Sequence, residues 1–130
     1  GISYASMGFD NKIIYAVTGA NGTGKDVVEA NILKSRLSGK SKNAANVFVG
    51  NIKPLTGECF AGGSAMQAAA AAMALHKGAI PPSTIGDGLI KEMDWYMPNA
   101  KAVETKIDMA LISSIGLEGR ASLLYLMRLY

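Results

Sequence analysis

The stretch IKPLTGECFAGGSAMQAAAAAMALHKGAIPPS, residues 52–83, decides the fold of this 130-residue chain. It begins with a lysine and a glycine-rich corner, and continues into a run of small residues at 64–77. This run predicts a helix that is apolar on nearly every face, and such a helix belongs between two other layers of structure. Gly78 is expected to end the helix, and residues 80–82 (Ile-Pro-Pro) to force an extended exit.

Two short strands are expected before this helix. The β-branched and aromatic run KIIYAV at 12–17 predicts a buried strand, and VFVGNI at 47–52 predicts a second. Between them the sequence predicts a helix that begins near Asp26, its N-cap or first-turn acid, and runs to Leu37 before Gly39. The face of this helix that is expected to pack inward carries Val28, Ile32 and Leu33.

The C-terminal part predicts an antiparallel hairpin. Apolar runs at 109–115 and 121–129 flank Gly116 and Gly119, and residues 87–98 before them are expected to be irregular. The predicted order is β-α-β-α-β-β, which is an α/β fold with a layered sheet in one domain spanning residues 1–130. Ligands of such sheets bind beside the carboxyl ends of strands, so we expect three glycine loops to converge there: 19–24, 57–63 and 116–119.

Composition excludes several classes of function. The net charge is only +3 and the basic residues are spread along the chain with few aromatics nearby, which favours a solvated basic face over a nucleic-acid site. Cys59 and His76 are the single cysteine and histidine, so no intrachain disulfide and no metal site are expected. The apolar run within 61–78 is too short for a membrane span.

The N-terminal stretch GISYASMG suggests where the chain comes from. It has no initiator Met and reads as the middle of a domain, so we expect a piece of a longer protein. It also lacks the basic-then-apolar pattern of a signal peptide, which favours a cytoplasmic location.

The segment VTGANGTGKD, residues 17–26, is compatible with a different function, nucleotide binding. Gly19, Gly24 and Lys25 fit most of the G-x-x-x-x-G-K-[ST] pattern of a phosphate-binding P-loop. That site needs a hydroxyl after the lysine to hold Mg²⁺, and here the position is Asp26. A P-loop nucleotide-binding protein is therefore the alternative from another class, and a thermal shift with Mg-ATP would test it.

Residues 52–83 resemble the C-terminal half of the β-ketoacyl-acyl-carrier-protein synthases. That family has a K-[ST]-x-x-G-H corner, a core helix of small residues and an I-P-P-[ST] exit. The matching positions here are Lys53, Gly57, Gly62, the Ala-rich helix, Gly78 and residues 80–83. YAVTGANGTGKDVVE resembles the family's strand and H-G-T corner, and SSIGLEGRASLLYL resembles its terminal hairpin.

The resemblance implies a thiolase-like fold of two similar halves stacked in five layers, usually dimeric. This chain would supply the C-terminal half, with the Ala-rich helix as a middle layer. Implied partners are the N-terminal half of the same fold, an acyl carrier protein and a ketosynthase in a homo- or heterodimer, with no cofactor. The family's nucleophilic cysteine lies on the N-terminal half, so Cys59 is interpreted as a small buried hydrophobe.

The family's chemistry falls on altered positions. Its two catalytic histidines, which donate hydrogen bonds where negative charge builds up, correspond to Asn21 and Glu58, while its lysine is kept as Lys53. Asn21 can still donate through its amide. An ionised Glu58 cannot donate, its charge opposes an enolate, and it is expected to pair with Lys53 in a salt bridge.

The hairpin loop also departs from the family. Leu117 stands where the family has a gating Phe, between Gly116 and Gly119, while Glu118 replaces a glycine and Arg120 shortens a Thr-Asn pair.

These substitutions favour a β-ketoacyl synthase-like subunit that does not itself catalyse condensation. The resemblance is to chain-length factors, which pair with an active synthase in fatty-acid or polyketide biosynthesis. An active, carrier-protein-dependent condensing acyltransferase with an altered site is the second interpretation, so enzymatic activity is left open.

The remaining candidate residues have structural interpretations. His76 is expected at a helix end, and Met66 and Met73 are expected to pack on the buried helix. The carboxylates expected to add loop polarity rather than bind metal are Asp87, Glu92 and Asp94. Residues 95–97 (Trp-Tyr-Met) are expected at a core edge or a partner contact.

Overall fold

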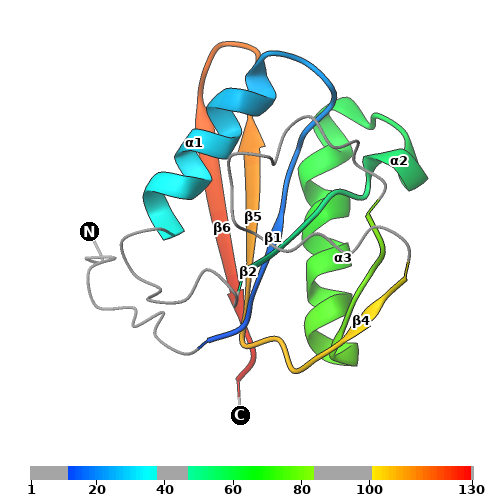
Figure 1. Ribbon diagram of the computed structural model, residues 1–130. Helices are drawn as coiled ribbons and strands as arrows, with labels where there is room; N and C mark the ends of the chain where they lie inside the picture. The colour runs from blue at the N-terminus through cyan, green and yellow to red at the C-terminus, as the bar shows by residue number, and fades with distance from the viewer. Residues whose placement is uncertain (1–11, 38–46, 84–100, 130) are drawn as a thin grey trace.

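The computed structural model describes residues 12–37, 47–83 and 101–129. A four-stranded sheet of order β2-β1-β5-β6 lies between helix α1 on one face and helix α3 on the other (Figure 1). The strands are β1 (Ile14–Val17), β2 (Val47–Gly50), β5 (Met109–Ile115) and β6 (Ala121–Met127), and the helices are α1 (Lys25–Leu37) and α3 (Gly63–Lys77). The predicted α/β fold and its β-α-β-α-β-β order are confirmed.

Several predictions concern residues outside the described ranges. These are the helix stop at Gly39, the irregular segment 87–98, the carboxylates of Asp87, Glu92 and Asp94, and the aromatic cluster at 95–97.

Strand β1 is the centre of the sheet. It pairs in parallel with both β2 and β5, and all four of its residues are buried. Ile14 and Ala16 pack in the cluster beneath α1, while Tyr15 and Val17 pack in the cluster beneath α3. A strand covered on both faces reads as a continuous apolar run, which explains the sequence KIIYAV.

Helix α1 buries Leu33, as predicted, but not the whole of the predicted face. The buried side chains are Asp26, Glu29, Leu33 and Leu37, whereas Val28 is 52% exposed. Leu33 and Leu37 pack on the sheet, and the same stripe carries two carboxylates that accept hydrogen bonds from the loop after β1. The prediction for Val28 was wrong because buried polar partners, not apolar spacing alone, set the rotation of the helix.

Helix α3 packs on the sheet through one face. Ala71, Ala74 and Leu75 are buried against it, but Met66 and Met73 are 45% and 57% exposed. The expectation that these methionines pack inside was wrong for this chain, since the sheet covers only one side of the helix. Gly78 ends the helix in the left-handed conformation, as predicted.

Short elements complete the fold. Two single turns, α2 (Lys53–Thr56) and η3 (Phe60–Gly62), form the glycine-rich corner before α3. After α3, the extended exit forms β3 (Ala79–Ile80), which pairs antiparallel with β4 (Val103–Glu104). The predicted hairpin is present, since β5 and β6 pair antiparallel from Met109 and Met127 to Ile115 and Ala121.

Candidate functional site

Three loops meet at one end of the sheet and enclose a cavity of about 560 Å³. The first loop follows β1, the second lies between α2 and α3, and the third joins β5 to β6. Lining residues include Gly19 and Asn21 from the first, Glu58 and Phe60 from the second, and Leu117 and Glu118 from the third. The sequence predicted this convergence, because parallel strands end at the same edge of a sheet.

Buried side chains hold the start of the first loop. The backbone N–H of Gly19 donates to Glu29 Oε1 at 2.7 Å, and the hydroxyl of Ser113 on β5 donates to the same oxygen. From α3, Gln67 Nε2 donates to the carbonyl of Thr18 at 2.6 Å. The loop is thus fixed to α1, β5 and α3 before it reaches Asn21.

Asn21 itself is oriented by its neighbours. The carboxylate of Asp26 accepts the backbone N–H of Asn21 at 3.1 Å and that of Gly22 at 2.7 Å. Thr23 Oγ1 donates to Asn21 Oδ1 at 2.8 Å. Because the amide oxygen accepts this bond, the amide nitrogen is the end of the side chain left to donate elsewhere.

This geometry does not fit a phosphate cradle. A P-loop presents unpaired backbone N–H groups to the phosphates. Here the Asp26 carboxylate occupies two of them and Glu29 occupies a third. Lys25 lines the cavity, but carboxylates stand where phosphate oxygens would bind.

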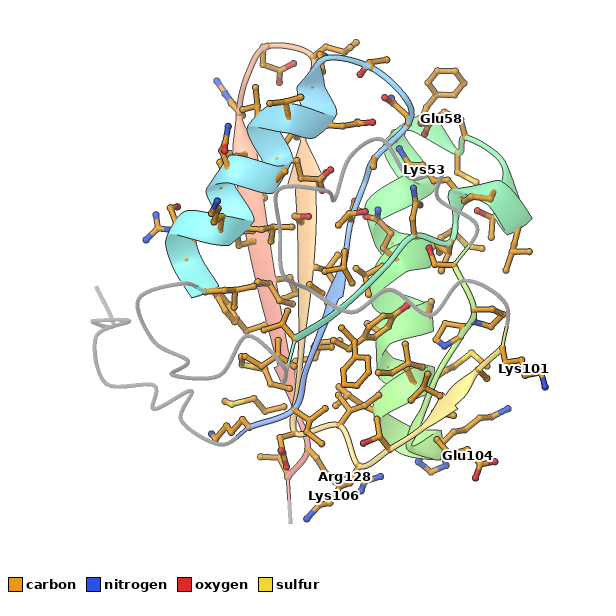
Figure 2. All side chains as sticks on the ribbon, viewed as in Figure 1. Lys53, Glu58, Lys101, Glu104, Lys106 and Arg128 are labelled. Carbon is orange, nitrogen blue, oxygen red and sulfur yellow. The ribbon has the colours of Figure 1, made fainter. Side chains whose placement is uncertain are left out.

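Lys53 and Glu58 form the predicted ion pair. Lys53 Nζ lies 2.7 Å from Glu58 Oε2, and Figure 2 shows the two side chains together at the end of the molecule away from Lys106 and Arg128. Nζ also donates to the carbonyl of Gly19 at 2.6 Å, so this lysine joins the second loop to the first.

Glu58 accepts hydrogen bonds from several directions. Besides Lys53, the backbone N–H of Phe60 donates to its Oε1 at 3.0 Å. The hydrogen bond from Lys53 lowers the pKa of Glu58, with further lowering from the Phe60 backbone and the Asn21 side chain. Glu58 is therefore ionised at neutral pH, and its carboxylate interacts with both Lys53 and the Asn21 side chain.

Glu29 is a buried carboxyl group that the sequence analysis did not single out. It is 5% exposed, and burial raises its pKa despite the opposing hydrogen bonds from Ser113 and Gly19. The nearby Asp26 raises this pKa further, while Lys53 lowers it. The cavity wall thus holds one carboxyl that resists ionisation and one, Glu58, that favours it.

The third loop is held by its own backbone. Gly116 N donates to Arg120 O at 2.8 Å and Gly119 N donates to Gly116 O at 3.1 Å. Gly119 has φ +82°, and Leu117 is 91% exposed at the edge of the cavity. The predicted glycine turn is confirmed, while the gating role of Gly116, Leu117 and Gly119 stays a prediction.

Two other residues can be compared with their sequence interpretations. Cys59 is only half-buried, so its description as a buried hydrophobe was wrong: it precedes the exposed turn η3 rather than entering the core. His76 is exposed in the last turn of α3, as expected. Its carbonyl and that of Leu75 accept hydrogen bonds from Arg128.

The described part of the chain shows neither a metal-binding cluster nor a helix that could span a membrane. Among residues 12–37, 47–83 and 101–129, no group of three or more His, Cys, Asp or Glu side chains is arranged to hold a metal ion. Within the same ranges, none of the helices has the length and apolar character needed to cross a bilayer.

Sequence reasoning missed the buried polar residues around the first loop: Glu29, Asn51, Gln67 and Ser113. Two of them left a signal. Gln67 interrupts an otherwise apolar helix, and Glu29 lies three residues after Asp26, on the same face of α1. Ser113 carries no such signal, since its partners are distant in sequence, and the contact of Asn51 with Ala20 spans 31 residues.

Comparison with known proteins identifies the class to which this fold and cavity belong. The family model described as the β-ketoacyl synthase, C-terminal domain, matches residues 3–86, which is more than half of the chain. The chain therefore belongs to the C-terminal domain family of the β-ketoacyl synthases. A search of curated proteins found no match.

Solved structures show the same fold at low sequence identity. One match is AntDE:AntF, a type II polyketide synthase acyl-carrier protein in complex with its ketosynthase bound to the hexaketide. The TM-score is 0.76 and the sequence identity is 19%. The match covers 91% of this chain and 28% of the chain in that complex. Another is the oxazolomycin ketosynthase domain OzmH KS7 of Streptomyces albus JA3453, with a TM-score of 0.77 and 17% identity. This match covers 92% of this chain and 22% of that chain. The chain thus spans about a quarter of the length of these thiolase-like proteins.

Proposed function

We propose that this chain is the C-terminal half of a β-ketoacyl synthase-like subunit of fatty-acid or polyketide assembly that does not itself catalyse condensation. It acts as a chain-length-factor-type partner of an active ketosynthase. The observation that carries the proposal is the ion pair of Glu58 with Lys53, at 2.7 Å. An ionised carboxylate at a position where the family has a hydrogen-bond donor repels the negative charge that develops during decarboxylation.

The proposed partners follow from exposed surfaces and from the structural neighbours. Helix α3 leaves Met66 and Met73 exposed on the side away from the sheet, which suits a second layer from the N-terminal half of the fold. AntDE:AntF contains a ketosynthase with its acyl carrier protein, and this supports a carrier protein as a partner here.

Decarboxylation of malonyl carrier protein by the intact protein tests the proposal. We expect no turnover by the protein alone, because loss of one donor of this type reduces the rate by about 10²–10³ and both family imidazoles are replaced here. Turnover at the rate of an ordinary ketosynthase would contradict the proposal.

Histidine substitutions show whether the two altered positions are responsible. The double variant Asn21→His with Glu58→His restores both imidazoles, and we expect decarboxylation to increase over that of the unaltered protein. Glu118→His is the matched control, since it makes the same Glu-to-His change on the same cavity at a position without a family histidine.

An active synthase with an altered site is the second candidate. The observation that favours it is the oriented amide of Asn21: its oxygen accepts from Thr23 and its side chain also hydrogen-bonds to Glu58, so a donor stands at this position. If the intact protein does turn over, this candidate expects Asn21→Ala to reduce the rate by about 10²–10³. An unchanged rate in Asn21→Ala would exclude it.

A further inference from the structure

Asn51 connects the first two loops of the cavity. It follows β2 directly and is 5% exposed. Its Nδ2 donates to the carbonyl of Ala20 at 2.6 Å, and its Oδ1 accepts the backbone N–H of Lys53 at 2.9 Å. Both ends of the amide are used, one on the first loop and one at the start of α2, which leads into the second loop.

The two backbone groups that Asn51 holds lie next to functional positions. Ala20 immediately precedes Asn21, so its carbonyl fixes where the Asn21 side chain begins. The N–H of Lys53 is at the start of α2, and from there the lysine side chain reaches Gly19 O and Glu58. Moving either backbone group changes the approach of Asn21 or Lys53 to Glu58.

Removing the buried amide of Asn51 is expected to destabilise both loops. Without it, the Ala20 carbonyl and the Lys53 N–H lose their partners beside a loop in which other polar groups are already paired. The backbone of Asn51 is held separately, since its N–H donates to Ser83 Oγ at 3.2 Å. The side-chain and backbone bonds of this residue can therefore be removed independently.

We propose that Asn51 is a positioning residue for the cluster of Asn21, Lys53 and Glu58, setting the separation of the two loops so that all three side chains meet. Its role does not depend on whether the subunit condenses acyl groups, because the effect is measured on Glu58 itself.

The test compares Asn51→Ala with Ser83→Ala in the intact protein. The pKa of Glu58 is followed by a ¹³C-carboxyl titration of glutamate-labelled protein, with the signal assigned by its loss in Glu58→Gln. We expect the pKa of Glu58 to shift upward toward its ordinary value in Asn51→Ala, since Lys53 and Asn21 are no longer held against it. Ser83→Ala removes a hydrogen bond from the same residue and is expected to leave this pKa in place.

Thermal unfolding separates positioning from general stability. If Asn51→Ala lowers the unfolding temperature as Ser83→Ala does while the Glu58 titration stays unchanged, the role is merely structural and the proposal is overturned. If the alanine variant does not fold, Asn51→Ser is used instead, and an unchanged Glu58 titration again overturns the proposal. The serine hydroxyl can accept the Lys53 N–H, but the side chain is too short to reach Ala20 O.

Discussion

The first and third loops line the same cavity but are held in opposite ways. From Thr18 to Gly22, the first loop is bonded by side chains from α1, α3, α2 and the residue after β2. The third loop, 116–120, has backbone turn bonds and projects Leu117 into solvent. Both are glycine-containing turns after a strand, yet side chains from several elements hold the first, whereas backbone turn bonds hold the third.

The difference suggests that the two loops have separate roles at the cavity. Rigid positioning suits groups whose orientation matters, and the first loop carries Asn21, which we propose stands at a family histidine position. An exposed loop suits a segment that accommodates ligands of different length, which is what the proposed gating role of Leu117 requires. Substitutions in the two loops are therefore expected to have very different costs.

The largest effect is expected from Glu29→Ala. It leaves the part-buried Gly19 N–H without an acceptor and the Ser113 hydroxyl with only its longer contact to Val17 O at 3.5 Å. Because an unpaired buried group costs about 1–3 kcal/mol, we expect a loss of about 2–4 kcal/mol. Urea denaturation measures it. Glu104→Ala makes the same change at an exposed site in β4 and should stay within about 0.5 kcal/mol. Equal losses in the two variants would contradict the rigid-loop interpretation.

Glu29→Gln tests the electrostatic part of the same contact and is expected to have a smaller effect, since an oxygen acceptor is kept. Burial raises the pKa of Glu29 in the folded state, so the folded protein holds this proton more tightly than the unfolded chain. The resulting stability is complete below the ordinary glutamate pKa and is lost as pH rises through the raised value. Urea denaturation across this range should show the loss in the unaltered protein.

The glutamine variant should lack this component of the pH dependence, because its amide does not titrate. Ser113→Ala is a useful companion, since it removes a neutral donor to Glu29 and leaves the titrating group in place. Parallel stability curves for the unaltered protein and Glu29→Gln would show that Glu29 titrates as it does in the unfolded chain.

Gly119→Ala tests the third loop and is expected to have the next smaller effect on stability. Its φ of +82° is in the left-handed region, where a side chain costs about 1–2 kcal/mol, although nothing lies within 4 Å of the added Cβ. Gly24→Ala is the control, because it also meets no atoms within 4 Å but has no positive φ. A similar urea midpoint for the two variants would show that the turn relaxes freely.

The sequence predicts the layered part of this molecule well, for physical reasons. A strand buried on both faces, an alanine-rich helix and glycine turns each leave a local pattern, and these gave β1, α3 and the hairpin. The rotation of α1 was missed because Glu29 is paired with Ser113, 84 residues away, and periodicity contains no information on such a partner. The same holds for Asn51, whose contact with Ala20 spans 31 residues.

The location of the site could be predicted from the sequence, but the contacts among its side chains could not. Glycine corners at the ends of parallel strands located the cavity, and the family pattern located Asn21, Lys53 and Glu58. How these side chains meet depends on buried amides and carboxyls that are chosen by the tertiary structure. A chain this rich in glycine also suggests a P-loop, and the argument against one from Asp26 in the sequence is joined by the occupied N–H groups of the first loop in the structure.

The smallest effect on stability is expected from Leu117→Ala. The side chain is 91% exposed and the loop is held by its backbone, so the free energy of unfolding should change by less than about 0.5 kcal/mol. This makes Leu117 the cleanest probe of gating, because any functional change cannot be attributed to unfolding. If the loop shapes the acyl chain, products made with an active ketosynthase partner should change in length distribution. An unchanged distribution would assign the chain-length role to another part of the cavity.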